Sequence, residues 1–204
     1  MRAAADEIGA RYIVADAADP NTFAAAIAPL EAIDLVVHAA GALGGTYARK
    51  QTFEQWRAII SANLDSCFVL TSAALPKMSA GSRFIFISSS ASYEPMMART
   101  AYSASKAGMN AFARALALEV DRDGIAVHIV TPGPVETEML QDVPFEMHAI
   151  HVSDVADTVA WLDTVDPSVD LPEIRLSAVR RGPYARVPVV PDEVHRRAAS
   201  AEKS

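Results

Sequence analysis

Short apolar runs that stop at polar residues or glycine recur along this chain of 204 residues. They occupy residues 11–16, 33–41, 83–89 and 125–130. A run of this length and boundary is typical of a buried strand, and strands that are apolar on both faces are typical of a parallel sheet. The pattern therefore predicts a strand in each of the four segments.

Longer segments with helical spacing of apolar residues follow these strands, at 52–78, 101–121 and 153–163. Thr52 and Ser153 stand just before acidic residues, an arrangement in which the hydroxyl caps a helix and the carboxylate suits its dipole. The alternation of strands and helices predicts an α/β fold with a parallel sheet. We expect one domain over 1–178 and a basic, proline-containing extension over 179–204.

Composition and charge narrow the range of partners and compartments. Apolar residues make up 51% of the chain, enough for one sizeable core, and the formal net charge of −7 argues against nucleic acid as the main partner. No uninterrupted apolar run approaches the length of a membrane span, and the first residues lack the apolar core of a secretory signal. The single cysteine, Cys67, suits a reducing compartment. We expect a cytoplasmic protein with neither a membrane nor a nucleic-acid partner.

Tyr102 and Lys106 stand one turn apart in the helix predicted at 101–121. A free phenol has a pKa of about 10, and a neighbouring ammonium favours the phenolate, so Lys106 is expected to adapt Tyr102 to proton transfer near neutral pH. The pair alone is a weak signal, because two such residues on a surface helix satisfy the same pattern.

Two further polar residues occur where the surroundings are apolar. Ser89 comes directly after a predicted buried strand, where its hydroxyl could hold a carbonyl oxygen in a crevice. Asn63 lies inside the long helix at 52–78, whose interior does not favour an amide. For Asn63 taken alone, a helix distortion or an intramolecular cap explains the pattern better than catalysis.

Residues 3–178 resemble the short-chain dehydrogenase/reductase family. The family's order of Asn, Ser and Tyr-x-x-x-Lys matches Asn63, Ser89, Tyr102 and Lys106. Four further segments resemble family motifs: His38-Ala39-Ala40-Gly41 the Asn-Asn-Ala-Gly turn, 131–137 the Pro-Gly-x-x-x-Thr cofactor loop, 154–156 the Asp-Val-Ala that opens a late helix, and 169–176 the last strand.

The resemblance implies a Rossmann-like, doubly wound sheet and hydride exchange between NAD or NADP and an alcohol/carbonyl substrate. Tyr102 would exchange the proton, Ser89 would bind the substrate oxygen, Lys106 would bind the ribose, and Asn63 would hold a relay water. The residues implied to contact the cofactor are Asp16, His38, Ala39, Ala40, Gly41, Tyr102, Lys106, Pro132, Gly133, Val135 and Thr137.

The sequence departs from the family pattern at its beginning. The glycine-rich turn that binds the pyrophosphate has no match here, so we expect a sheet without the family's first two strands and first helix. The strand predicted at 33–39 would then lie at an exposed edge. Two interpretations stay open: an oxidoreductase with an intact catalytic set, and a non-catalytic fragment or interaction protein that cannot bind a dinucleotide.

Other candidate residues have simpler interpretations. His38 replaces the commoner asparagine, and we expect an altered cofactor contact there. His148 and His151 lack a third ligand, so no metal site is assigned, and Cys67 is interpreted as a core residue. The loop at 138–152, with Met139, Leu140, Phe145 and Met147, is expected to cover an apolar pocket. Family analogy predicts a homo-oligomer in which a neighbour packs on small residues of the tyrosine helix: Ala107, Gly108, Ala111 and Ala115.

Overall fold

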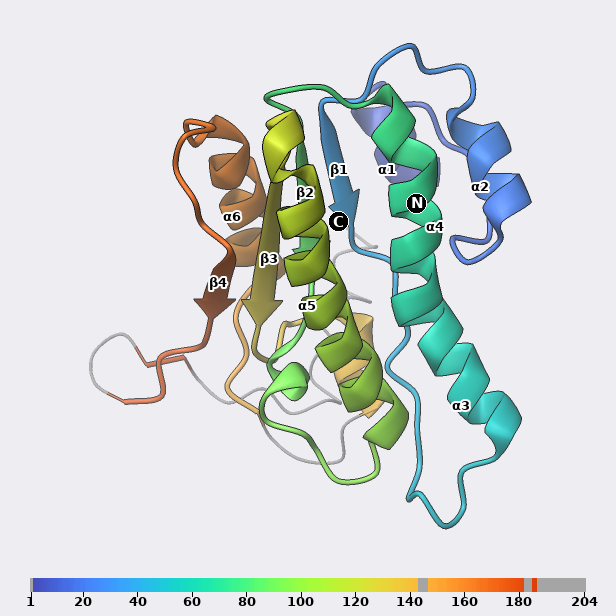
Figure 1. The fold of residues 1–204 in the computed structure, drawn as a ribbon. Coiled ribbons are helices and arrows are strands. Elements are labelled where there is room, and N and C mark those ends of the chain that lie inside the picture. Colours follow the sequence, from blue (N-terminus) through green and yellow to red (C-terminus); the bar gives the residue numbers. More distant parts are fainter. Residues whose placement is uncertain (1, 143–146, 182–184, 187–204) are drawn as a thin grey trace.

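A parallel sheet of four strands in the order β1-β2-β3-β4 forms the centre of the computed structural model, which describes residues 2–142, 147–181 and 185–186 (Figure 1). The strands are β1 (Leu35–His38), β2 (Arg83–Ile87), β3 (Ala126–Pro132) and β4 (Glu173–Leu176). The α/β fold and its parallel sheet are confirmed, with each of these strands inside or overlapping a predicted segment.

The register of the strands brings their carboxyl ends to one edge of the sheet. Leu35 pairs with Arg83, Arg83 pairs with Ala126, and Ile129 pairs with Glu173. The loops that follow β1, β2 and β3 therefore lie next to one another, which is where open α/β sheets bind their ligands.

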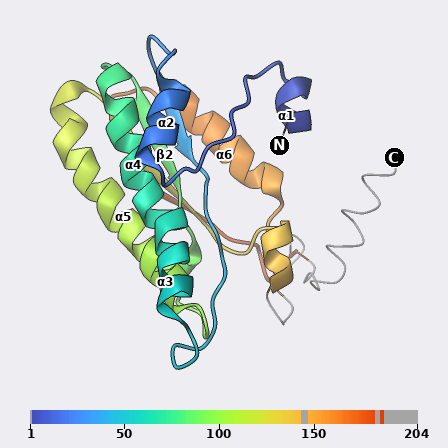
Figure 2. The same cartoon turned by 90° about the vertical axis from the view of Figure 1, so that its right-hand side faces the viewer.

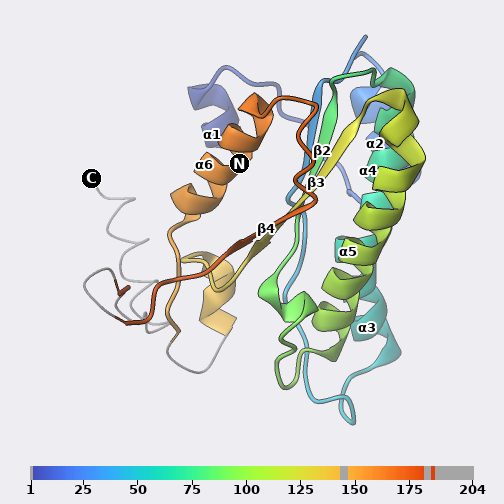
Figure 3. The same ribbon diagram turned by 60° about the vertical axis from the view of Figure 1, so that its left-hand side comes forward.

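Helices cover both faces of the sheet (Figures 2 and 3). On one face lie α2 (Pro20–Ile27), α3 (Phe53–Ile60), α4 (Ser66–Ala74) and α5 (Thr100–Val120). On the other lie α1 (Arg2–Glu7) and α6 (Val152–Thr164). The fold is thus doubly wound, as predicted.

Each face of the sheet has its own apolar core. Phe84, Phe86 and Ile129 point toward α4 and α5, where they pack with Cys67, Met109 and other buried side chains. Ile85 and Val130 point to the other face and pack with Leu162 of α6. The alternation of side chains along β2 therefore serves two cores, which explains why its sequence is apolar at consecutive positions.

The helix predicted at 52–78 is interrupted by a π-helical turn, Ser61–Asp65, and ends in a 3₁₀ turn, Leu75–Lys77. Thr52 begins it with a capping box: its hydroxyl accepts from the Gln55 N–H, and the Gln55 side chain accepts from the Thr52 N–H. By length and composition, the helical segment Phe53–Lys77 is long and apolar enough to span a membrane, although it contains no uninterrupted apolar run of that length. Its inner side packs in the core, where Cys67, Val69 and Ala74 are buried, and a soluble protein's core helix passes the same criteria.

Two local predictions were wrong. Residues 11–16 form no strand, and Tyr12, Ile13 and Val14 are exposed, because no neighbouring strand in the described part of the chain offers hydrogen bonds to them. The helix predicted at 153–163 is present as α6, but its cap is His151 and not Ser153, two residues earlier; the His151 ring accepts from the Ser153 N–H. The basic extension at 179–204 lies outside the described residues except for 179–181 and 185–186.

The packing of α6 on the sheet makes a matched prediction possible. Leu162 is 0% exposed between α6 and the sheet, whereas Leu118 on α5 is 84% exposed. Leu162→Ala should lower the free energy of unfolding by about 2–5 kcal/mol through lost contacts and a cavity. Leu118→Ala should change it by less than about 0.5 kcal/mol. Urea unfolding followed by circular dichroism measures both, and equal effects would contradict this packing.

Candidate active site

A cavity of about 670 Å³ opens at the end of the sheet where the carboxyl ends of the strands lie, and it extends between β1 and α6. All four residues of the predicted catalytic set line it: Asn63, Ser89, Tyr102 and Lys106. They come from three segments, the π-helical turn, the loop after β2 and α5, and are up to 43 positions apart in the sequence. The fold therefore brings together residues that the sequence only places in order.

Tyr102 and Lys106 face the cavity from the first turns of α5, where both side chains are buried. Burial raises the pKa of Tyr102, and a hydrogen bond with Ser89 acts in the opposite direction. The expected lowering of this pKa by Lys106 is not found. The Lys106 ammonium instead donates to the Ile87 carbonyl at 2.8 Å, and burial lowers its own pKa to about 8.

Ser89 is held at the cavity by the short 3₁₀ turn that it begins, Ser90–Ser92. Its hydroxyl oxygen accepts from the Ala91 N–H at 3.2 Å, and its carbonyl accepts from the Ser92 hydroxyl at 2.7 Å. With one lone pair engaged by the backbone, the hydroxyl proton is free to be directed at Tyr102 or at a substrate oxygen.

Asn63 lies in the π-helical turn and is 0% exposed. Its amide oxygen accepts from the Ala42 N–H at 2.8 Å, and its amide nitrogen donates to the Ala42 carbonyl at 2.9 Å. The same nitrogen donates to Ser105 on α5 at 3.0 Å. The alternatives weighed from the sequence thus coexist: the helix is distorted at Asn63, and the side chain ties the loop after β1 to α5.

Gly41 fits closely into this arrangement. A Cβ atom at this position would lie 2.5 Å from the Asn63 Oδ1 and 3.7 Å from the Lys106 Nζ. Any larger residue would push the Asn63 amide away from Ala42, so glycine is required here by close packing.

The residues that the resemblance assigned to cofactor binding fall into two groups. Those that line the cavity besides Tyr102 and Lys106 are Ala39, Gly41, Pro132, Gly133, Val135 and Thr137. Ala40, His38 and Asp16 are not among the described lining residues. The Asp16 carboxylate instead accepts from the Ala18 N–H at 2.9 Å.

His38 is a correction to the sequence analysis, because its ring lies in the core and not in the turn. The side chain is 1% exposed, its Nε2 is 2.8 Å from the Ser66 hydroxyl, and its ring packs against Phe86. Burial, with a further contribution from the Lys106 charge, lowers the pKa of His38 to about 4. A neutral core histidine replaces the altered cofactor contact that we expected.

The remaining reactive side chains have structural partners. Burial raises the pKa of the Cys67 thiol to about 12, and its Sγ donates to the Asn63 carbonyl, as expected of a core residue. His148 contacts the Arg186 carbonyl, and His151 caps α6. Among the described residues no cluster of three potential metal ligands occurs.

The sequence analysis missed a polar network behind the catalytic residues. It starts on α5, where Asn110 and Arg114 continue a line of polar residues that begins with Tyr102 and Lys106. These residues recur every fourth position, so they lie on one side of the helix. The Asn110 amide donates to the Ser92 hydroxyl at 3.1 Å and to the Tyr93 hydroxyl at 3.2 Å. This stripe of polar residues on an otherwise apolar helix was the signal that could have revealed it.

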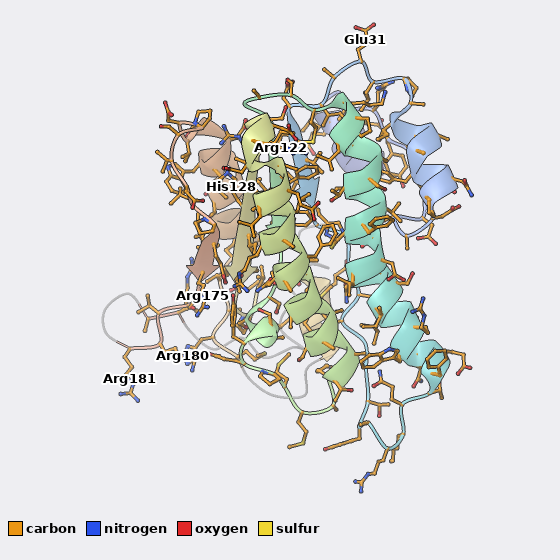
Figure 4. The ribbon with its side chains drawn as sticks, viewed as in Figure 1. Glu31, Arg122, His128, Arg175, Arg180 and Arg181 are labelled. Atoms are coloured by element: carbon orange, nitrogen blue, oxygen red, sulfur yellow. The ribbon has the colours of Figure 1, made fainter. Side chains whose placement is uncertain are left out.

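Glu173 on β4 is the acceptor at the far end of this network. Its carboxylate accepts from Tyr93 at 2.5 Å, from Arg114 at 2.8 Å and from Thr131 at 3.0 Å. Arg175 stacks over the Tyr93 ring at 4.0 Å, and Figure 4 shows it on β4, ahead of Arg180 and Arg181. Burial acts to raise the pKa of Glu173. The hydrogen bonds from Tyr93, Thr131 and the arginines together outweigh burial, so the pKa lies below its ordinary value. The network links the turn after β2, the end of β3 and the start of β4 to α5.

These features define a class of proteins: doubly wound α/β proteins with a ligand cavity at the carboxyl edge of a parallel sheet and a Ser-Tyr-Lys set on its wall. The sequence profile of the family described as short chain dehydrogenase matches residues 2–147. The chain therefore belongs to the short-chain dehydrogenase/reductase family.

Individual relatives agree with this assignment. Over 146 residues the chain is 34% identical to nodulation protein G of Azospirillum brasilense, covering 68% of this chain and 59% of that protein. Over 124 residues it is 36% identical to an acetoacetyl-CoA reductase of an Acinetobacter species, covering 58% of this chain and 50% of that protein. The chain thus spans little more than half the length of these relatives.

Solved structures share the fold. The crystal structure of BdcA in complex with NADPH matches with a TM-score of 0.78 at 24% identity, over 86% of this chain and 77% of that one. A short chain dehydrogenase from Burkholderia cenocepacia in complex with NADP matches with a TM-score of 0.76 at 24% identity, over 86% of this chain and 79% of that one.

The buried His38 should make stability depend on pH. Its pKa is about 4 in the folded chain against 6.5 ordinarily, so between these values the unfolded chain binds a proton that the folded chain does not. The free energy of unfolding should fall by about 3 kcal/mol as pH decreases through this window, and His38→Asn should remove that part of the decrease. Urea unfolding at several pH values measures it. An equally steep slope in His38→Asn would contradict the assignment.

Proposed function

We propose that this chain carries the catalytic part of an NAD(P)-dependent oxidoreductase that interconverts an alcohol and a carbonyl compound. The observation that supports this most is the convergence of Asn63, Ser89, Tyr102 and Lys106 on one cavity. The family, and relatives named as reductases, support the reaction class.

Tyr102 is the proposed proton donor in reduction and the proton acceptor in oxidation. Its high pKa in this structure keeps it protonated at neutral pH, as a donor must be. Ser89, bonded to the same phenol, would donate to the substrate oxygen and stabilise the negative charge that develops there.

The proposed cofactor is NAD or NADP, which supplies the hydride when bound. The lining fits its nicotinamide end, because Gly41 leaves space beside Lys106 and because Pro132, Gly133, Val135 and Thr137 form the adjacent wall. Lys106, already desolvated and held by the Ile87 carbonyl, would bind the ribose hydroxyls. Asn63 would then serve by holding the 41–43 loop in place.

Cofactor titration of the chain tests this function against the alternative of a fragment that binds no dinucleotide. We expect saturable enhancement of NADPH or NADH fluorescence in the wild-type chain, and Tyr102→Phe should keep the binding constant within a few-fold. With a reducible ketone, Tyr102→Phe should lower the turnover rate by about 10²–10⁴-fold. Failure to saturate at millimolar cofactor would favour the non-catalytic alternative, and undiminished turnover in Tyr102→Phe would refute the role of the phenol.

We also propose a homo-oligomer that forms through the outer side of α5, in a protein of the cytoplasm. Ala107, Ala111 and Ala115 are exposed there, next to Leu118, whereas Gly108 packs within the chain against Leu64. Small exposed residues allow a second helix to approach closely.

Ala111→Arg should shift the chain to monomer, because a symmetric contact would bring two desolvated charges together. Light scattering coupled to size exclusion measures the mass, and Ala25→Arg on the exposed side of α2 is the control. A wild-type chain that is already monomeric would contradict the proposal.

A further inference from the structure

The cavity lining includes five apolar side chains from its loops, which we call the apolar arm: Leu43, Met96, Met139, Leu140 and Met147. Leu43, Leu140 and Met147 belong to the same packed cluster as Tyr102, so the arm begins at the proposed proton donor. A substrate whose carbonyl oxygen lies at Tyr102 and Ser89 would extend the rest of its chain along these residues.

Charged groups on the cavity wall lie elsewhere. Among the lining residues that the structure describes, only Lys106 and Asp163 carry charge. Lys106 is engaged by the Ile87 carbonyl, and Asp163 lies 3.7 Å from Arg83, at the opposite end of β2 from Ser89. Ser89 follows Arg83 by six residues of extended chain, a distance of about 20 Å. Among the described residues of the arm, a charge on the substrate's tail would find no partner, and it would lose its hydration.

We propose that the substrate is an uncharged carbonyl compound or alcohol with an apolar chain, bound through this arm. The proposal rests on the proposed oxidoreductase function and adds the substrate class. Methionine side chains are flexible and polarisable, so three of them in one arm allow chains of different shape to bind at similar affinity.

A matched pair of ligands tests the substrate class without turnover. 2-Octanone and 7-oxooctanoate share the methyl ketone and differ by a carboxylate at the tail. Saturation-transfer NMR on the whole chain should give 2-octanone a dissociation constant at least about tenfold lower. Equal affinities, or binding of neither ligand, would overturn the proposal.

A variant places the ligand in the arm. Met96→Lys adds a cation to the arm and should raise the relative affinity for 7-oxooctanoate by about tenfold or more. Met97→Lys is the control, because Met97 is 78% exposed and is not among the lining residues; an equal change in both variants would refute the location.

The two proposals can fail separately. Tyr102→Phe should bind 2-octanone with the wild-type preference, since the arm does not need the phenol's proton. If 2-octanone binds with the predicted preference and the chain with NADPH does not reduce it or any longer methyl ketone, the oxidoreductase function fails and the substrate class stands. If ketones are reduced without preference for an uncharged tail, the substrate class fails and the oxidoreductase function stands.

Discussion

The site depends on the paired hydrogen bonds between the Asn63 amide and the backbone of Ala42. Asn63 can make both because the helix opens into a π-helical turn at this point, which turns its side chain toward the loop after β1. The third bond, to Ser105, links this loop to α5 only three residues from Tyr102. Because Gly41 packs against the same amide, one residue fixes three walls of the cavity. A buried amide without these partners would be destabilising, so the distortion and the bonds support each other.

A second constraint holds the opposite wall. Glu173 collects hydrogen bonds from Tyr93, Thr131 and Arg114, and Asn110 connects Tyr93 with the turn that begins at Ser89. Three strand ends and α5 are thereby tied together outside the cavity. The charged groups of this network, Glu173, Arg114 and Arg175, are not among the described residues that line the cavity.

The sequence was sufficient for the parts of the fold that depend on local pattern. Apolar runs located β1, β2 and β3, and Thr52 located the start of α3, because burial and capping leave periodic signals. The prediction of a strand at 11–16 was wrong. The apolar pattern of a strand is present there, but no strand in the described part of the chain pairs with it. The sequence analysis also misplaced His38, because alternation along β1 decides which face a side chain takes and the motif does not. The network around Glu173 depends on contacts between residues 42 to 80 positions apart, which no local pattern reveals.

The position of β1 has a consequence for the chain in solution. Within the described residues β1 pairs only with β2, and Val37 and the apolar segment at Tyr12–Val14 are exposed. The unpaired N–H and C=O groups of such a strand can pair with the same strand of another molecule. Association through β1 needs two molecules. The rate at which soluble protein is lost on storage should therefore increase more than proportionally with protein concentration. The unpaired edge of β1 is therefore a site at which two copies of the chain can associate even while the core of each stays folded.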